Sequence, residues 1–194
     1  VLVNSYSDKL PSVLSDNRKG AYLAGRYLIE HGHKTVALLA GVRSYLSNQE
    51  RTAGFLQAFQ EEGLSIPPEL ILETGSWLYD AAEKVCLNFF NTYTGEMPTA
   101  LFAFNDRLAT GAINAICKTG RTVPDDVSVI GYDNLGYYNI ISPRITTVET
   151  HIEAISESTV MHMIWQLNNG SCLPVKVLTP VEVISGETVR SLLC

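Results

Sequence analysis

The stretch LFAFNDRLATGA (residues 101–112) passes from a strand pattern to a helix pattern with only two polar residues between them. Its apolar first part is typical of a strand that is buried on both faces. Helix formers and small residues follow, so a helix is expected to begin at Asn105 or Asp106. Asp106 is expected to cap this helix or to be an acid of its first turn. A cap accounts for one of the two polar residues and leaves the other unexplained.

The same alternation of strand and helix patterns continues on both sides of this stretch. Parallel strands are joined by crossover helices, so the pattern predicts an α/β fold with an open parallel sheet and helices on both faces. The expected strands are 12–15, 35–41, 69–75, 99–104 and 126–133, and the expected helices are 20–33, 51–63, 79–94 and 106–119.

The pattern changes after residue 139. The segment 142–149 looks like an extended connector, and a helix at 151–167 and a final strand at 176–184 follow it. We interpret this tail as part of a second lobe. The chain begins at Val1 in what looks like a strand, which favours a fragment whose second lobe lies mostly upstream.

The bulk composition limits the classes of partner. The formal net charge is −6 and the pI is near 5.2, which argues against nucleic-acid binding by this chain itself. No window is long and apolar enough to span a membrane. The cysteines lack the spacing of a zinc site, and Cys86 and Cys117 are expected to be buried free thiols on apolar helix faces.

Polar and aromatic side chains follow the predicted strands where each strand ends. In open parallel sheets, ligands bind beyond the carboxyl ends of the strands, so these side chains are expected to meet at one rim. They include Tyr45, Ser47 and Arg51 after strand 35–41, Trp77 after 69–75, Asn105 after 99–104 and Asp133 after 126–133.

The chemistry of this rim favours a small polar ligand. Carboxylate, amide and guanidinium groups suit vicinal hydroxyls or a polar heterocycle, and an indole offers a flat face, so a sugar is expected ahead of a nucleobase. Structural alternatives remain open: Trp77 could be a packing residue, and Arg51 a solvated residue of a first helical turn. Asp133 has no following helix to cap.

An enzyme is not predicted. The rim has no histidine or glutamate pair, and the G-x-S-x-G nucleophile motif is absent. Neither G-x-x-x-x-G-K-[ST] nor G-x-G-x-x-G occurs, so we expect no nucleotide cofactor. The cysteines and histidines lack the spacing of metal ligands, so we expect no metal.

Several motifs in consecutive order resemble the lac repressor family of transcriptional regulators. They are GHKTVALLAG, ERTAGFLQAF, PTALFAFNDRLATGAINAI, VPDDVSVIGYDN and ITTVE. The resemblance implies a periplasmic-binding-protein-like domain of two α/β lobes with an effector in the cleft between them. By this resemblance, residues 1–15 are a remnant of the N-terminal lobe and 16–140 the complete C-terminal lobe. Residues 141–175 are a crossover and a helix of the N-terminal lobe, and 176–194 the final strand and tail.

The resemblance also implies roles for the rim residues. Asp133 and Arg51 would bind effector hydroxyls, Asn105 would add an amide contact and Trp77 would wall the pocket. Tyr45 and Ser47 lie in the loop that helps select the effector. Purine-responsive members carry arginine in place of Tyr45, which favours a sugar over a purine.

The partners and location follow from the same resemblance. We expect a cytoplasmic homodimer that binds operator DNA only through a domain missing from this chain, with no membrane contact. The alternative is a secreted sugar-binding protein of a transporter, which shares the fold and would have a signal peptide upstream.

Overall fold

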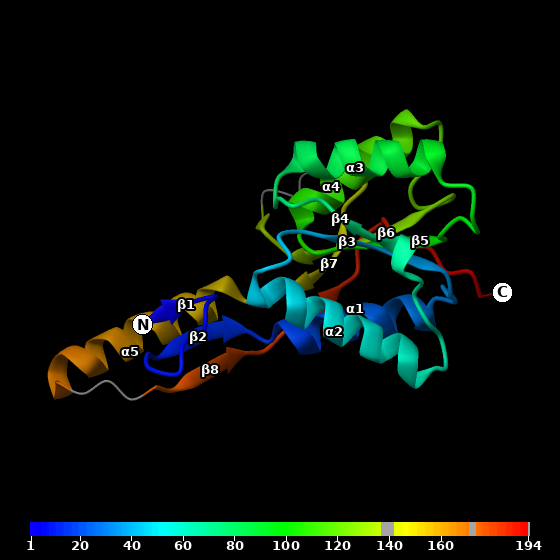
Figure 1. Cartoon of the computed structure of the whole chain (residues 1–194). Helices are drawn as coiled ribbons and strands as arrows, with labels where there is room; N and C mark the ends of the chain where they lie inside the picture. The colour runs from blue at the N-terminus through cyan, green and yellow to red at the C-terminus, as the bar shows by residue number, and fades with distance from the viewer. Residues whose placement is uncertain (137–141, 171–173, 194) are drawn as a thin grey trace.

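A computed structural model describes residues 1–136, 142–170 and 174–193 of the chain. Figure 1 shows a larger body, in which helices cover both faces of a sheet, and a narrow arm beside it. The body contains a six-stranded sheet and the arm a three-stranded one. The chain therefore has the predicted α/β architecture.

The sheet of the body is parallel except at one edge. Five strands pair in parallel, and β9 is antiparallel to its neighbour β7. The pairing aligns the carboxyl ends of the parallel strands along one side of the sheet. In order across the sheet, the strands are β4 (Ile71–Glu73), β3 (Val36–Ala40), β5 (Ala100–Ala103), β6 (Ser128–Asp133), β7 (Thr146–Glu149) and β9 (Glu182–Ile184).

Two pairs of helices enclose this sheet (Figure 1). The helices α1 (Asn17–Glu30) and α2 (Leu46–Glu61) pack on one face, and α3 (Tyr79–Thr92) and α4 (Asp106–Lys118) pack on the other. A short 3-10 turn, η1 (Pro68–Leu70), leads into β4. The apolar core lies between these layers.

Aromatic side chains form the centre of the core. Phe55 of α2 and Phe102 of β5 are fully buried and stack with their ring centroids 4.8 Å apart. Cys86 is buried, which raises the pKa of its thiol to about 12. Cys117 is exposed, because it lies on the outer side of α4, so its predicted burial is wrong.

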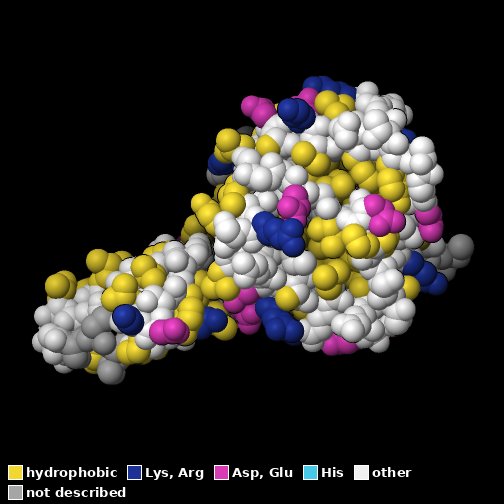
Figure 2. Space-filling model, in the orientation of Figure 1, with side chains coloured by type: hydrophobic (Ala, Val, Ile, Leu, Met, Phe, Trp, Pro, Cys, Tyr) yellow, Lys and Arg dark blue, Asp and Glu magenta, His cyan; other side chains and the backbone are white. Residues whose placement is uncertain are grey.

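The arm is a small parallel sheet with one helix beside it. Its strands are β1 (Leu2–Val3), β2 (Ser12–Ser15) and β8 (Lys176–Thr179), and its helix is α5 (Ile152–Asn169). Within α5, Ile155 is the one buried residue. Figure 2 shows hydrophobic side chains at the surface of the arm. Those of α5 include Val160, Met161, Ile164, Trp165 and Leu167, each at least 44% exposed.

Two expected elements have different bounds in the structure. The single strand expected at 176–184 is two strands, β8 in the arm and β9 in the body. Pro180 lies between them, and its missing N–H cannot continue a strand ladder. Helix α2 begins at Leu46, five residues before the helix expected at 51–63, so part of the polar segment ahead of that helix is also helical. Part of this polarity is used inside the protein, because buried Asn48 accepts the N–H of Gly41 at 2.9 Å.

The segment 142–149 was expected as a connector and contains a strand of the larger sheet. Its residues 146–149 form β7, which pairs with β6 from Ile130↔Thr146 to Asp133↔Glu149. The chain then continues from β7 into α5, so β7 also leads from the body to the arm.

Candidate functional site

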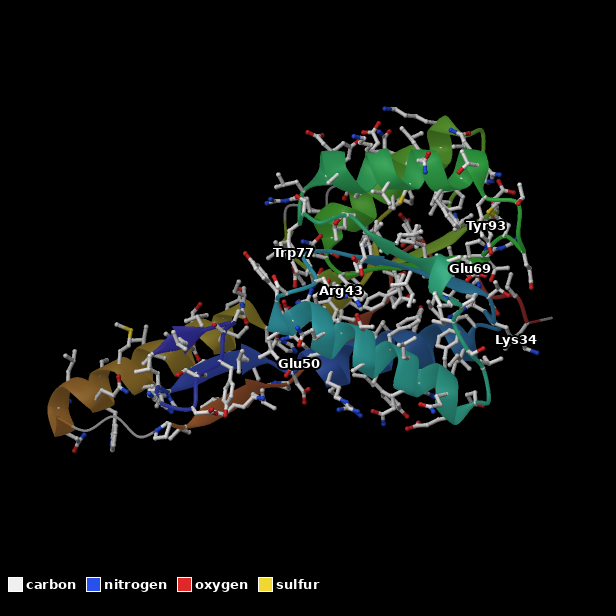
Figure 3. The ribbon with its side chains drawn as sticks, viewed as in Figure 1. Lys34, Arg43, Glu50, Glu69, Trp77 and Tyr93 are labelled. Carbon is white, nitrogen blue, oxygen red and sulfur yellow. The ribbon has the colours of Figure 1, made fainter. Side chains whose placement is uncertain are left out.

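A polar cavity of about 280 Å³ lies where the strands of both sheets end. It includes a residue of the arm and residues of the body, and Figure 3 shows Trp77 where the arm joins the body. The lining residues are Asn4, Asn17, Tyr45, Ser47, Arg51, Trp77, Asn105 and Asp133.

The six candidate ligand-binding residues among the side chains expected at the rim all line this one cavity. The cavity also includes Asn4 and Asn17, which the sequence interpretation missed. Asn4 directly follows β1 and Asn17 follows β2, so the rule that ligands bind beyond carboxyl strand ends would have found both.

Arg51 is held in one orientation by three acceptors. Its Nε donates to Asn17 Oδ1 at 2.9 Å, its Nη1 donates to the carbonyl of Phe104, and its Nη2 donates to Asp133 Oδ1 at 3.3 Å. The guanidinium also lies 3.6 Å from the ring centroid of Tyr132. Arg51 is only 7% exposed, so this is a largely buried cation rather than a solvated first-turn arginine.

Asp133 ends β6 in a backbone conformation that is rare for a residue other than glycine. Its φ is 105°, and Asn134 has a φ of 51°. The turn is bound to the segment after β7, because Thr150 Oγ1 donates to the carbonyl of Asp133 at 3.2 Å and Asn134 Nδ2 donates to Glu149. Burial raises the pKa of Asp133, and the charge of Arg51 opposes this shift.

Asn105 is the cap of α4. Its Oδ1 accepts the N–H of Leu108 at 2.7 Å, so Asn105 is the cap, and Asp106 is the acid of the first turn, the second of the two roles expected for it. Asn105 takes the cap position because its backbone is extended, whereas Asp106 is already helical. With its oxygen used by the cap, Asn105 retains an amide nitrogen as the donor that it could offer to a ligand.

Asp106 is buried beneath the cavity and does not line it. Its Oδ1 accepts the hydroxyl of Thr147 at 2.6 Å, and its Oδ2 accepts the N–H of Leu135 at 3.3 Å. The side chain is 1% exposed, and burial raises its pKa to about 7. Thr147 and Leu135 are distant in sequence, so no local pattern could identify these contacts.

Trp77 and Tyr45 form the aromatic side of the cavity. Their ring centroids are 6.1 Å apart with an interplanar angle of 35°. The indole packs against Gly41, where a Cβ would lie 2.5 Å from the ring, so Trp77 both packs on the end of β3 and lines the cavity. A partly exposed indole of this kind offers an apolar face to a ring-shaped ligand.

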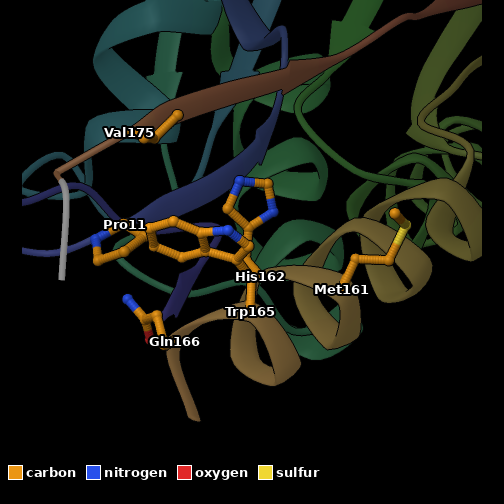
Figure 4. A pocket seen from close by; sticks show the side chains of 6 residues that line it. All are labelled: Pro11, Met161, His162, Trp165, Gln166 and Val175. Atoms are coloured by element: carbon orange, nitrogen blue, oxygen red, sulfur yellow. The ribbon is translucent and has the colours of Figure 1, made fainter. Parts of the chain in front are cut away.

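A second cavity has a different character. It lies between α5 and the sheet of the arm, has a volume of about 330 Å³, and is lined largely by apolar groups (Figure 4). Its residues are Pro11, Met161, His162, Trp165, Gln166 and Val175. This lining lacks the charged pair that the polar cavity has.

Residues 1–136, 142–170 and 174–193 contain neither a metal-binding cluster nor a membrane-spanning helix. In these ranges no group of three or more His, Cys, Asp or Glu side chains could hold a metal ion. No helix there is both long and apolar enough to cross a membrane.

Comparisons with known proteins identify similar chains. The profile of the periplasmic binding protein-like domain matches residues 26–189. The probable HTH-type transcriptional repressor ExuR of Bacillus subtilis (strain 168) is 31% identical over 189 residues, covering 94% of this chain and 54% of the relative. The HTH-type transcriptional repressor PurR of Pasteurella multocida (strain Pm70) is 33% identical, covering 95% of this chain and 54% of the relative. The chain thus spans about half the length of these curated relatives.

Solved structures show the same fold. A putative transcriptional regulator LacI from Bacillus cereus subsp. cytotoxis superposes with a TM-score of 0.89 at 25% identity, covering 96% of this chain and 65% of that one. A dimeric Lac repressor superposes with a TM-score of 0.85 at 27% identity, covering 95% of this chain and 67% of that one.

The buried carboxyl group of Asp106 predicts a pH dependence of stability. A pKa raised from 3.8 to about 7 on folding contributes stability at low pH that is lost as the pH rises through that range. The side chain of Asp106→Asn stays neutral. The free energy of unfolding of this variant should therefore rise relative to that of the wild type by about 1.4 kcal/mol per pH unit between about pH 5 and pH 7. Urea unfolding of both proteins at several pH values measures this difference.

Asp126→Asn is the matched control. Asp126 is hydrogen-bonded by Thr122, which lowers its pKa, so its removal should give a difference in unfolding free energy that is flat above pH 5. A flat difference for Asp106→Asn as well would show that Asp106 does not titrate in this range.

Proposed function

We propose that this chain, which belongs to the periplasmic binding protein-like domain family, binds a small polar effector in the cavity between its two sheets. It is an effector-binding domain of the lac repressor type. The observation that carries the proposal is the convergence of eight side chains from successive strand ends on one polar cavity. Its relatives are transcriptional repressors, which supports a regulator ahead of an enzyme or a transport receptor.

We infer that the effector is a sugar or a sugar derivative. The charged pair of Arg51 and Asp133 and the amides of Asn4, Asn17 and Asn105 provide donors and acceptors for hydroxyl groups. Trp77 provides a flat apolar face. Similar folds have been solved as the CelR–cellobiose complex and as an Enterococcus faecium regulator with bound ribose. Because relatives named PurR are also similar to this chain, a purine base is the alternative effector.

Regulation would act through the connections between the two sheets. The chain passes between body and arm at Asp16, at Thr150 and His151, and at Pro180. A ligand that contacts Asn4 in the arm and Asp133 in the body would favour one relative orientation of the two, and its differential affinity would shift the population. In a cytoplasmic homodimer, this shift would change operator affinity through a DNA-binding domain outside this chain.

We propose that the arm belongs to an N-terminal lobe that other residues of the whole protein complete. The apolar side chains exposed on α5 and the apolar cavity of Figure 4 support this, because such surfaces are usually covered in a folded protein. In this account residues 1–15, α5 and β8 belong to that lobe. Residues 16–140, of which 137–140 lie outside the described residues, form the C-terminal lobe together with β7 and β9.

Calorimetric titration of the whole protein, in which the N-terminal lobe is complete, with D-ribose, cellobiose and hypoxanthine tests the effector class. We expect one of the two sugars to bind more tightly than hypoxanthine. Asp133→Ala should weaken that binding by tenfold or more, about 1.4 kcal/mol, because it removes a charge-assisted acceptor from the cavity. Asp126→Asn, which is remote from the cavity, should leave the affinity unchanged.

Two results would contradict these proposals separately. Tighter binding of hypoxanthine than of either sugar would replace the sugar by a purine. A sugar affinity that Asp133→Ala leaves unchanged, in a protein that remains folded, would place the effector outside this cavity.

The exposed surface of α5 gives a second test. The chain should self-associate at micromolar concentrations through this apolar surface, and the double substitution Met161→Glu with Leu167→Glu should reduce association in sedimentation velocity. Ser156→Glu adds a charge to the same helix without removing an apolar group, so it should have a smaller effect. A wild-type chain that remains monomeric would contradict the proposal that other parts of the protein pack on this apolar surface.

A further inference from the structure

We propose that Asp106 is a positioning residue whose buried carboxylate ties the turn that carries Asp133 to strand β7. The proposal deepens the proposed function and rests on it where ligand affinity is concerned. Asp106 lies beneath the cavity rather than in it, so it would act through the turn of residues 133–135 and not by contact with the effector.

The two carboxylate oxygens bind different parts of the fold. Oδ2 accepts the N–H of Leu135, the residue that follows the two turn residues with positive φ. Oδ1 accepts the hydroxyl of Thr147 in β7. A single side chain at the start of α4 therefore joins the turn to the strand that leads into the arm.

Strand β6 leaves space for this carboxylate. A Cβ on Gly131 would lie 2.3 Å from Asp106 Oδ1, so any other residue there would displace the carboxylate or the strand. Because residue 131 has no side chain, the carboxylate of Asp106 can lie against β6 in the position from which it makes both hydrogen bonds.

An effect on the helix dipole does not explain this burial. A carboxylate in a first helical turn interacts favourably with the dipole while it is exposed to solvent. Asp80, in the first turn of α3, is such an exposed acid. Burial of Asp106 penalises its charged form, so an additional interaction must favour its position.

The turn has a need for such an anchor. Asp133 and Asn134 both adopt left-handed backbone conformations, which persist in non-glycine residues only where the surroundings hold them. If the N–H of Leu135 lost its acceptor, the turn could relax and move Asp133 away from Arg51. The hydrogen bond from Thr150 to the carbonyl of Asp133 links the same turn to the segment that leads into the arm. Relaxation of the turn would therefore also loosen that segment.

Amide hydrogen exchange measured by NMR tests the anchor without any ligand. In Asp106→Ala, the exchange rate of the Leu135 amide should rise by about tenfold or more, while amides of strand β3, such as Leu38, keep their protection. Thr147→Val should give a smaller rise at the turn. Asp106→Asn keeps one acceptor oxygen and should restore most of the protection, and Asp80→Asn should change nothing at the turn.

The opposite pattern would overturn the proposal. Unchanged exchange of the Leu135 amide in Asp106→Ala, or an equal rise at Leu38, would show that Asp106 stabilises the fold generally and holds no particular turn. If Asp106→Ala does not fold, the same comparison of Leu135 with Leu38 in Thr147→Val decides the matter.

Titration with D-ribose and cellobiose connects the anchor to function. For whichever sugar the wild type binds, Asp106→Ala should weaken the affinity by about tenfold, and Asp106→Asn should restore part of it. These titrations use the whole protein, in which the N-terminal lobe is complete. If its wild type binds neither sugar, the proposed sugar effector fails, whereas the exchange rates still decide the role of Asp106. If Asp106→Ala shows faster exchange at Leu135 and still binds the sugar with wild-type affinity, the positioning role is contradicted.

Discussion

The buried guanidinium of Arg51 is the interaction on which the rest of the polar cavity depends. Its three acceptors come from the start of α1, the end of β5 and the end of β6, so one side chain joins three separate parts of the rim. A buried cation needs such partners, and loss of one partner of a buried pair typically costs about 3–5 kcal/mol. Asn17, Asp133 and the ring of Tyr132 are therefore placed as much by Arg51 as by their own strands.

A second set of hydrogen bonds, outside the contacts of Arg51, stabilises the segments that carry the polar groups of the cavity. Asn105 uses its oxygen to cap α4, Asn48 holds the chain after β3, and Asp106 contacts the turn after β6. These bonds fix side chains and turns before any ligand is present. The apolar cavity of the arm has a different lining, which agrees with our proposal that it is covered by protein rather than filled by a polar ligand.

Much of the fold and most of the site could be predicted because both follow from strand order. Alternating strand and helix patterns gave the parallel sheet, and the carboxyl ends of its strands gave Tyr45, Arg51, Trp77, Asn105 and Asp133. Asn4 and Asn17 were missed because they follow strands of the smaller sheet, and the sequence pattern does not place that sheet beside the rim of the larger one. That Asn105 and not Asp106 caps α4 could not be predicted, since both residue types cap helices and the contact that binds Asp106 comes from Thr147, far along the chain.

The chain has two tryptophans, and they lie in different cavities, Trp77 in the polar one and Trp165 in the apolar one. Their indole N–H signals in an NMR spectrum therefore report separately on the two sites. We predict that titration with D-ribose or cellobiose shifts the signal of Trp77, together with the side-chain amides of Asn4, Asn17 and Asn105, and leaves Trp165 in place. A shift of Trp165 without a shift of Trp77 would contradict the assignment of the effector to the polar cavity.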